Sequence, residues 1–273
     1  MTELCCGSAA VSMAALGQKP PAPYMGGKAR FARAILHHME VTSKPRKVLL
    51  VDAGPWGDVW HTLSRSTRSQ LDVVERLKDL IAVEDIGDAA KALARESVPE
   101  CRVEHAARFL LLQQLSWRSK AVWEHDGSWV WAGLSETHAY GLAGTPRFGG
   151  VAPQAPGMPQ RVAALQLDAV AGYRCDVRDL VVPDDIYMDP PYLGTEGYGS
   201  ELPRADVLAH VSRLVDAGAR VTVSEAEALG APCVRSAIVG QKGKSSGLNT
   251  THRTEWVSMT FPAAQVSLFG STP

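Results

Sequence analysis

The chain has 273 residues, of which 45% are hydrophobic and 21% charged, so it can bury one large core or a core with a smaller lobe. No stretch approaches the roughly 18 uninterrupted apolar residues of a membrane span, and the N-terminus has no charged segment followed by an apolar one, so we expect a soluble, cytoplasmic protein. The net charge of -1 argues against indiscriminate electrostatic binding of nucleic acid, and any such partner would be held by local patches.

The five cysteines are scattered, without a C-x-x-C pair or a Cys/His pair at zinc spacing. We expect reduced thiols and no metal site.

Strand-like and helix-like segments alternate along the chain. In chain order they are a helix over Gly27–Met39, a strand over Lys47–Val51, helices over Val73–Leu80 and Ala106–Leu115, a strand over Ile186–Met188, a helix over Asp206–Ala217 and a strand over Arg220–Val223. This alternation predicts an α/β fold with a doubly wound sheet, in which ligands bind at the carboxyl ends of the strands.

The segment 116–160 interrupts the alternation. It holds four of the seven tryptophans, followed by a Gly/Pro-rich tract, which is too long for a routine connector and too aromatic at its start for a disordered linker. We interpret it as an inserted lobe between residues 1–115 and 161–262, and residues 263–273 as a tail.

One strand-like run ends in an unusual tetrapeptide, Asp189-Pro190-Pro191-Tyr192. Methyl transfer to the exocyclic amine of a base needs acceptors for the amine hydrogens, because the nitrogen lone pair is delocalised into the ring. Asp189 and the carbonyl of Pro190 would be those acceptors, since the prolines stiffen the backbone. Tyr192 would stack on the base, a contact worth roughly 1–3 kcal/mol that offsets part of the cost of extruding the base from a duplex. The alternative is a strand that ends in a plain proline turn.

A second motif stands at the N-terminus, where Glu3 precedes the small-residue turn Cys5-Cys6-Gly7-Ser8-Ala9 and an apolar run. An acid at a strand end, a small-residue turn and a helix together form the place where a doubly wound sheet receives an adenosyl ligand. A simple β-turn-α packing joint is the alternative.

The third motif is Gly26-Gly27-Lys28, before an expected helix. Paired glycines would allow close approach of a ligand at the positive helix end, and Lys28 could hold a carboxylate or phosphate. The spacing is not that of a phosphate-binding P-loop, and a plain helix start is the alternative.

Two further acids follow strand-like or turn segments. Asp52 ends the run KVLLV and could accept from a ribose diol, and Asp176 could accept from an adenine amino group. Taken alone, each acid fits a solvated turn residue or a helix cap better than a ligand contact.

Together these residues resemble the DNA adenine methylase family, the alpha-group of DNA amino-methyltransferases that use S-adenosylmethionine. DPPY matches the family's catalytic motif, PYMGGKARFARAIL looks like its GGK segment, and ELCCGSAAV looks like its cofactor loop, with Ala9 where a second glycine is usual. The resemblance implies a Rossmann-like methyltransferase sheet, with catalytic residues Asp189, Pro190, Pro191 and Tyr192. It implies an S-adenosylmethionine site lined by Glu3, Cys5, Gly7, Ala9, Gly26, Gly27, Lys28, Asp52 and Asp176.

The resemblance also implies a partner, double-stranded DNA. Under this resemblance, residues 116–160 are the target-recognition lobe, and residues 1–115 together with 161–262 are the catalytic domain. A basic Gly/Ser-rich hairpin would be the last structural element of that domain. Candidate DNA contacts are then Trp117, Arg118, Lys120, Arg147, Lys242 and Lys244. For the tryptophans, a small satellite core is the alternative.

Two departures from the family pattern stand out. The GGK segment follows the cofactor loop, whereas in the family it precedes it, so the chain is either permuted or uses DAGPWG as its working loop. We prefer ELCCGSA, because Gly7 and Ala9 stand four and six positions after the acid, as the family's small residues do. The near-neutral charge is the second departure.

The tail residues Gln265, Leu268 and Phe269 resemble the Q-x-x-L-F peptide by which bacterial replication proteins dock on the sliding clamp. A clamp tether would raise the local concentration of DNA.

The sequence therefore predicts an S-adenosylmethionine-dependent DNA methyltransferase that modifies the N6 amine of a flipped adenine. Two alternatives remain: a methyltransferase for the N4 amine of cytosine or for an RNA base, and a degenerate methyltransferase fold that serves as a DNA-binding module.

Overall fold

The computed structural model describes residues 1–24, 27–134, 157–192, 202–246 and 249–262, and within its last two strands it describes only the backbone of 241–246 and 249–253. The predicted tail, 263–273, and residues 135–156 of the predicted lobe lie outside the described residues.

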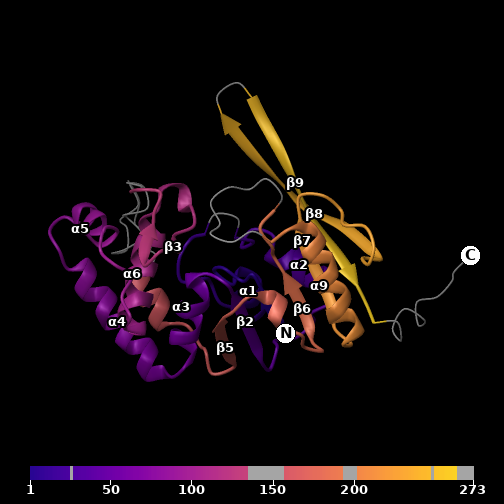
Figure 1. Ribbon diagram of the computed structural model, residues 1–273, viewed down its shortest axis with the longest axis horizontal. Helices are drawn as coiled ribbons and strands as arrows, with labels where there is room; N and C mark the ends of the chain where they lie inside the picture. Colours follow the sequence, from indigo (N-terminus) through magenta and orange to yellow (C-terminus); the bar gives the residue numbers. More distant parts are fainter. Residues whose placement is uncertain (25–26, 135–156, 193–201, 247–248, 263–273) are drawn as a thin grey trace, which may run out of the picture.

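A seven-stranded, mostly parallel sheet is the centre of the fold (Figure 1). Its strands are β1 (Thr2–Leu4), β2 (Val48–Asp52), β5 (Val170–Arg174), β6 (Asp185–Met188), β7 (Arg220–Glu225), β8 (Arg235–Ser246) and β9 (Asn249–Thr260). They follow the order β5-β2-β1-β6-β7-β9-β8, in which β9 alone runs antiparallel to its neighbours β7 and β8. The predicted α/β class with a largely parallel sheet is therefore confirmed.

The three predicted strands all belong to this sheet, as parts of β2, β6 and β7. Three of the four predicted helices are also confirmed, with shifted bounds, as α4 (Thr67–Ile81), α6 (Arg102–Leu115) and α9 (Arg204–Asp216). α4 begins earlier than predicted because the Ser66 hydroxyl accepts a hydrogen bond from the Ser69 N–H, 3.0 Å away, and caps the helix.

The predicted helix over Gly27–Met39 is wrong at its start. The helix, α2, spans only Ala32–His38, and residues 29–31 form a turn before it. Lys28 consequently does not lie at a helix N-terminus, and its expected contact with a ligand through the helix dipole has no basis in the fold.

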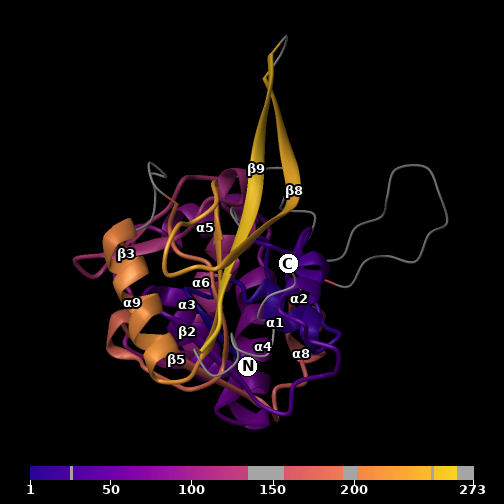
Figure 2. The ribbon, with the colours of Figure 1, turned by 90° about the vertical axis from the view of Figure 1, so that its right-hand side faces the viewer.

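Helices cover both faces of the sheet, with α9 on one side and α1 (Ala10–Ala15) and α2 on the other (Figure 2). The strand register aligns Leu50, Glu3, Tyr187, Thr222 and Met259 in one row across five strands. Residues in one row point to the same face. Since Tyr187 and Met259 pack with residues of α1 and α2, that face is the one these two helices cover.

The largest core cluster lies between the β2 and β5 side of the sheet and a group of helices that pack on it. These are α3 (Pro55–Ser64), α4, α5 (Ile86–Leu93), α6 and α8 (Met158–Ala163). The small antiparallel sheet β3 (Trp123–His125) and β4 (Ser128–Val130) joins the same cluster through Trp129, which is 6% exposed. The described part of the predicted lobe is therefore packed into the main core.

Strands β8 and β9 form a two-stranded ribbon that projects well beyond the helices (Figures 1 and 2). The base of the ribbon is anchored by the pairing of β9 with β7, from Val221 with Thr260 to Glu225 with Trp256. The short turns η1 (Trp117–Ser119) and η2 (Val177–Asp179) complete the described elements.

Helix α3 crosses β5 at very short range, which Gly172 makes possible. A Cβ atom at Gly172 would lie 2.3 Å from the carbonyl carbon of Trp60 and 2.5 Å from the amide nitrogen of His61. Because these are backbone atoms, they cannot yield by a rotamer change. We predict that Gly172→Ala lowers the free energy of unfolding by about 3 kcal/mol in urea titrations. Gly230→Ala is the matched control, because nothing lies within 4 Å of its added Cβ, and equal stability of the two variants would contradict the prediction.

Candidate active site

Strand β1 has parallel neighbours on both sides: β2 followed by β5 on one side, and β6 followed by β7 on the other. Such a reversal of strand order opens a crevice at the carboxyl ends of the central strands. The turn that follows β1 begins at Cys5, and Asp189 follows β6 directly. Two of the predicted motifs thus meet at this point, and the Asp189 N–H donates to the carbonyl of Leu4 at 3.2 Å.

The small-residue turn after β1 is tightly wound. Cys5, Gly7 and Ala9 all have positive φ angles, of 52°, 46° and 54°. A Cβ at Gly7 would lie 2.6 Å from the Tyr24 ring, and the Trp60 indole N–H donates to the Gly7 carbonyl at 2.8 Å. Gly7 is therefore needed both for the backbone angle and for the contact with the aromatic ring.

Tyr24 is a site residue that the sequence interpretation did not assign. Its ring packs against Gly7 and makes an edge contact with Trp56, with ring centroids 5.9 Å apart. Its carbonyl lies 3.0 Å from a Cβ placed on Gly27, and the Ser8 hydroxyl oxygen lies 3.3 Å from the same point. Gly27 of the GGK segment therefore lies against the turn after β1. Gly26 is outside the described residues.

Asp52, the last residue of β2, joins the two loops between which the sequence left a choice. One carboxylate oxygen accepts from the Gly7 N–H and the other from the Gly54 N–H, both at 2.8 Å. Burial raises the pKa of Asp52 above its usual value, against the lowering effect of these two donors. Each carboxylate oxygen has a second lone pair, so Asp52 retains acceptor capacity for a hydroxyl group.

Glu3 lies in the middle of β1, not at its end as the sequence suggested. The carboxylate accepts from the Ser12 N–H in α1, 2.7 Å away, and the residue is 2% exposed. Burial between Leu50 and Tyr187 raises its pKa to about 7. Glu3 thus links β1 to the first turn of α1, which follows the small-residue turn.

Asp176 follows β5 at the same edge of the sheet. Its carboxylate accepts from the Arg178 N–H at 2.9 Å and pairs with the Arg178 guanidinium at 2.6 Å. Burial, together with the carboxylates of Asp52, Asp189 and Asp176, raises the pKa of the Cys5 thiol well above its usual value. Three predicted acids therefore lie near enough to the first turn to raise the pKa of one of its thiols.

Lys28 contacts a second group of candidate site residues, which comes from the tetrapeptide and from β9. It is only 3% exposed, and its ammonium lies 2.7 Å from Asp189 Oδ1 and 3.5 Å from Glu255 Oε1. It also stands 4.6 Å from the centroid of the Tyr192 ring. Lys28, predicted to line the cofactor site, thus contacts two residues of the tetrapeptide.

Two buried acids of this cluster were not found from the sequence. Glu255 accepts a hydrogen bond from the Tyr192 hydroxyl and is 3% exposed. Glu225, at the end of β7, has its pKa raised by burial. Burial and the nearby carboxylate of Asp189 likewise raise the pKa of Tyr192, which therefore stays protonated. Pro190, the second residue of the tetrapeptide, is buried.

The predicted DNA contacts divide into several groups. Trp117 is 42% exposed, and the Arg118 guanidinium and the Lys120 ammonium lie 4.3 Å and 5.6 Å from its ring centroid. The buried Gln113 amide holds this turn by donating to the carbonyls of Ser119 and Lys120 and to that of Pro23, at 3.1–3.3 Å. Lys242 and Lys244 lie in β8, and Arg147, Gln265, Leu268 and Phe269 lie outside the described residues.

The other tryptophans of the predicted lobe serve packing. Trp129 stacks at a tilt on His105 and Phe109, and the Trp131 indole donates to the Leu112 carbonyl at 3.0 Å. Trp123 fills the space beside Gly54, where an added Cβ would lie 2.3 Å from its ring. These three tryptophans therefore pack against the main body of the fold and form no separate satellite core among the described residues, whereas Trp117 remains on the surface.

One group of side chains in the described part of the chain has the spacing of metal ligands, namely Asp58, His105 and Glu124. The Arg174 guanidinium already donates to Asp58 at 2.6 Å and to Glu124 at 2.8 Å. Its positive charge neutralises the carboxylates that a cation would need, so we assign no metal to this group.

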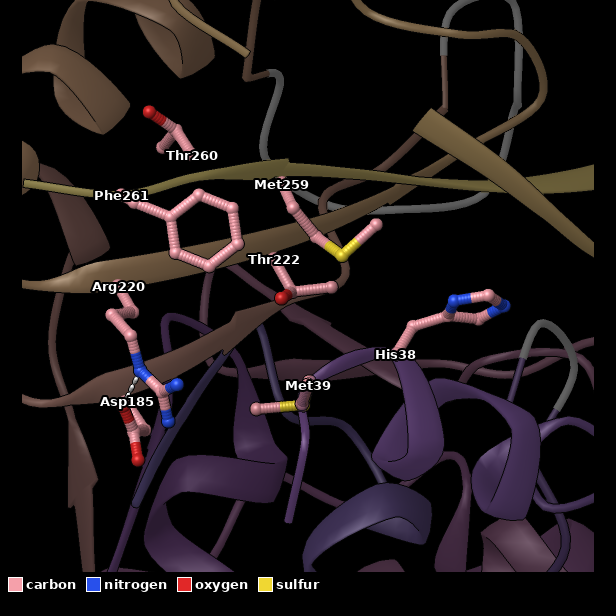
Figure 3. Close-up of a pocket in the computed structure, with 8 residues that line it drawn as sticks. All are labelled: His38, Met39, Asp185, Arg220, Thr222, Met259, Thr260 and Phe261. Carbon is pink, nitrogen blue, oxygen red and sulfur yellow. Dashed lines mark hydrogen bonds and ion pairs between the residues drawn. The ribbon is translucent and has the colours of Figure 1, made fainter. Parts of the chain in front are cut away.

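A small pocket lies at the opposite edge of the sheet, beside the first residues of β6 and β7 (Figure 3). Arg220 points toward Asp185 there and donates to it at 2.6 Å, while Met39, Met259 and Phe261 close the apolar side. Because its one guanidinium is already paired, this pocket offers less chemistry than the carboxyl edge of the sheet.

A comparison with protein-family models and with curated proteins finds no match for the sequence. In the described part of the chain, no helix combines the length and the apolar character needed to cross a membrane.

The buried Glu3 generates a prediction about pH. Its folded pKa of about 7 exceeds the ordinary value of 4.5, so between these values the folded state holds a proton that the unfolded state has lost. The free energy of unfolding should therefore fall by about 3 kcal/mol as pH rises through this window. Glu3→Gln should match the wild type near pH 4.5 and exceed it at pH 8.

Urea unfolding between pH 4.5 and 8 measures this difference. Glu75→Gln, whose parent side chain is 67% exposed on α4, is the control and should show no such divergence. Parallel pH curves for Glu3→Gln and the wild type would refute the assignment.

Proposed function

We propose that this protein is an S-adenosylmethionine-dependent DNA methyltransferase that acts on the N6 amine of a flipped adenine. The observation that carries the proposal is the position of Asp189, the first residue of the tetrapeptide, beside the turn after β1 at the strand-order reversal of a mostly parallel sheet. A candidate amine acceptor and a candidate cofactor loop are thus adjacent at the carboxyl ends of the central strands, where ligands bind in such sheets. The strand order and the two motifs together support a Rossmann-like methyltransferase sheet.

The proposed chemistry at the base needs only hydrogen-bond acceptors and an aromatic ring. Asp189 and the Pro190 carbonyl accept the two amine hydrogens and favour a tetrahedral nitrogen. Tyr192 stacks on the base, with its hydroxyl fixed by Glu255. The proton released from nitrogen passes to solvent after the transfer.

The residues at the carboxyl edge fit the donors of the proposed cofactor. Asp52 and Asp176, at the ends of the neighbouring strands β2 and β5, present carboxylate oxygens for a ribose diol and for an adenine amine. The turn that contains Gly7 follows β1, the next strand beyond β2, and the Gly7 N–H donates to Asp52. When bound, S-adenosylmethionine supplies a methyl group activated by its sulfonium charge.

DNA would meet the protein through Trp117, Arg118 and Lys120 and through the β8–β9 ribbon. Between Ala228 and Thr254 the sequence has four Lys or Arg residues and no acid. A two-stranded ribbon has the size to enter the major groove. Local positive charge of this kind suits a DNA partner in spite of the overall charge of -1.

One observation favours a second candidate function, a DNA-binding module without catalysis. Asp189, the proposed amine acceptor, is ion-paired to Lys28 at 2.7 Å. Calorimetry with S-adenosylmethionine separates the candidates, because absence of cofactor binding by the folded protein would contradict the enzyme and favour the module.

We predict that Asp189→Ala reduces methyl transfer to DNA by about 100-fold or more, because the amine loses its charged acceptor. The affinity for S-adenosylmethionine should stay within about threefold, since Asp189 would contact the base. Transfer of labelled methyl groups and calorimetry measure the two quantities. Asp79→Ala, whose parent side chain is 72% exposed, is the control, and an active Asp189→Ala would refute the assignment.

The modified base can be identified directly. We predict that mass spectrometry of nucleosides from DNA treated with the protein and S-adenosylmethionine contains N6-methyladenine. If N4-methylcytosine alone were found, or if only RNA were methylated, the adenine assignment would be wrong and the substrate would be cytosine or RNA.

The tail generates a separate prediction about a partner. Replacing Leu268 and Phe269 together by alanine should abolish capture of the protein by a bacterial sliding clamp, because the apolar pair would fill the clamp's pocket. Gln265 would anchor the polar contacts of the same peptide. Methyl transfer to short DNA should be unchanged, and undiminished capture of the double variant would refute docking through the tail.

A further inference from the structure

Glu255 is a buried acid that the proposed methyl transfer uses only as a hydrogen-bond acceptor. Its side chain is 4% exposed, and one oxygen, Oε1, receives the Tyr192 hydroxyl while lying 3.5 Å from the Lys28 ammonium. The residue belongs to β9, the antiparallel strand of the sheet. The closing strand thus contributes a charge to a site otherwise built from the GGK segment and the tetrapeptide.

The position of Lys28 conflicts with the proposed binding of a base. The ammonium lies 2.7 Å from Asp189 Oδ1, which would accept from the amine, and 4.6 Å from the Tyr192 ring centroid, where the base would stack. Lys28 therefore occupies both contacts that a flipped base needs. Its ammonium has to move before a base can enter.

We propose that Glu255 is a positioning residue that draws the Lys28 ammonium away from Asp189 and off the Tyr192 ring when a base enters. This inference rests on the proposed methyltransferase function. Glu255 Oε1 is already close to the ammonium, so a small rotation of the lysine side chain completes the transfer. The ammonium keeps a carboxylate partner throughout, which avoids the several kcal/mol cost of an unpaired buried charge.

The same oxygen also keeps the stacking platform in place. Because the Tyr192 hydroxyl donates to Glu255 Oε1, the ring stays fixed while the lysine leaves its face. One acid therefore holds the aromatic ring and receives the cation.

Glu255→Gln tests the charge separately from the hydrogen bond. The amide oxygen still accepts from the Tyr192 hydroxyl, but it no longer attracts the ammonium, which stays on Asp189. We expect kcat for methyl transfer to DNA to fall about tenfold, with KM for S-adenosylmethionine within about twofold. Asp189 and Lys28 remain a balanced pair in this variant, so it should unfold in urea at the same concentration as the wild type or a higher one.

A second substitution distinguishes positioning from a structural role. In Glu255→Gln with Lys28→Met, no ammonium competes for Asp189, so the double variant should recover most of the lost kcat. A purely structural Glu255 would make the double variant worse than the single one, because a second buried residue is altered. Glu75→Gln is the matched control for loss of a carboxylate on the surface.

The outcomes separate the two proposals. A wild-type protein that binds but does not methylate DNA overturns the proposed function and this inference with it. An active wild type with an equally active Glu255→Gln, or with a double variant no better than the single one, overturns this inference alone. Loss of the folded state in Glu255→Gln would make the acid a structural core residue and would also overturn it.

Discussion

The ammonium of Lys28 sets the arrangement of the candidate site, because a buried lysine must be met by carboxylates. Asp189 comes from the segment after β6 and Glu255 from β9, while Lys28 itself follows the first helix of the chain. Three segments that are far apart in the sequence are therefore held at one point. Because one ammonium contacts carboxylates from both segments, the packing of β9 and the position of the tetrapeptide depend on each other.

The order of the motifs along the chain matters less than this meeting point. The GGK segment follows the turn after β1, where a methylase of the resembling family would have it first. In the structure Gly27 nevertheless lies against Ser8 and Tyr24, and α2 packs on the sheet beside α1. The contact is made from within the segment that links α1 to α2. Spatial adjacency of the two segments, and not their order, is what a ligand at this edge would require.

The sequence predicted the elements whose signal is local. The apolar runs of β2, β6 and β7 were found because buried parallel strands are uninterrupted in hydrophobicity. Glu255 could not be found, because its burial depends on the pairing of β9 with β7 and on a lysine more than 200 residues away. Strand β5 was missed because Gly172 lowers its strand propensity, although the close approach of α3 requires that glycine.

Identical residue types also took different roles for reasons that lie outside the local sequence. Trp129 and Trp117 belong to the same aromatic segment, yet the first is 6% exposed and the second 42%. Trp129 faces His105 and Phe109 of α6, whereas Trp117 lies in a turn after that helix has ended. Composition predicted an aromatic lobe, but only the position of α6 decides which rings fill the core and which remain available to a partner.

The charges around Lys28 bear on the kind of ligand that the crevice favours. Asp189 and Glu255 oppose one ammonium, and Glu225 adds a further acid whose pKa is raised by burial. A partly buried surplus of negative charge is unfavourable by itself and is relieved by a ligand that carries a positive charge. Under the proposed function, the methyl donor is such a cation and the spent cofactor is neutral. Because Asp189 and Glu255 contact the base and the lysine and not the donor in this proposal, the attraction acts over a distance, and it favours the positively charged donor over its neutral product only modestly.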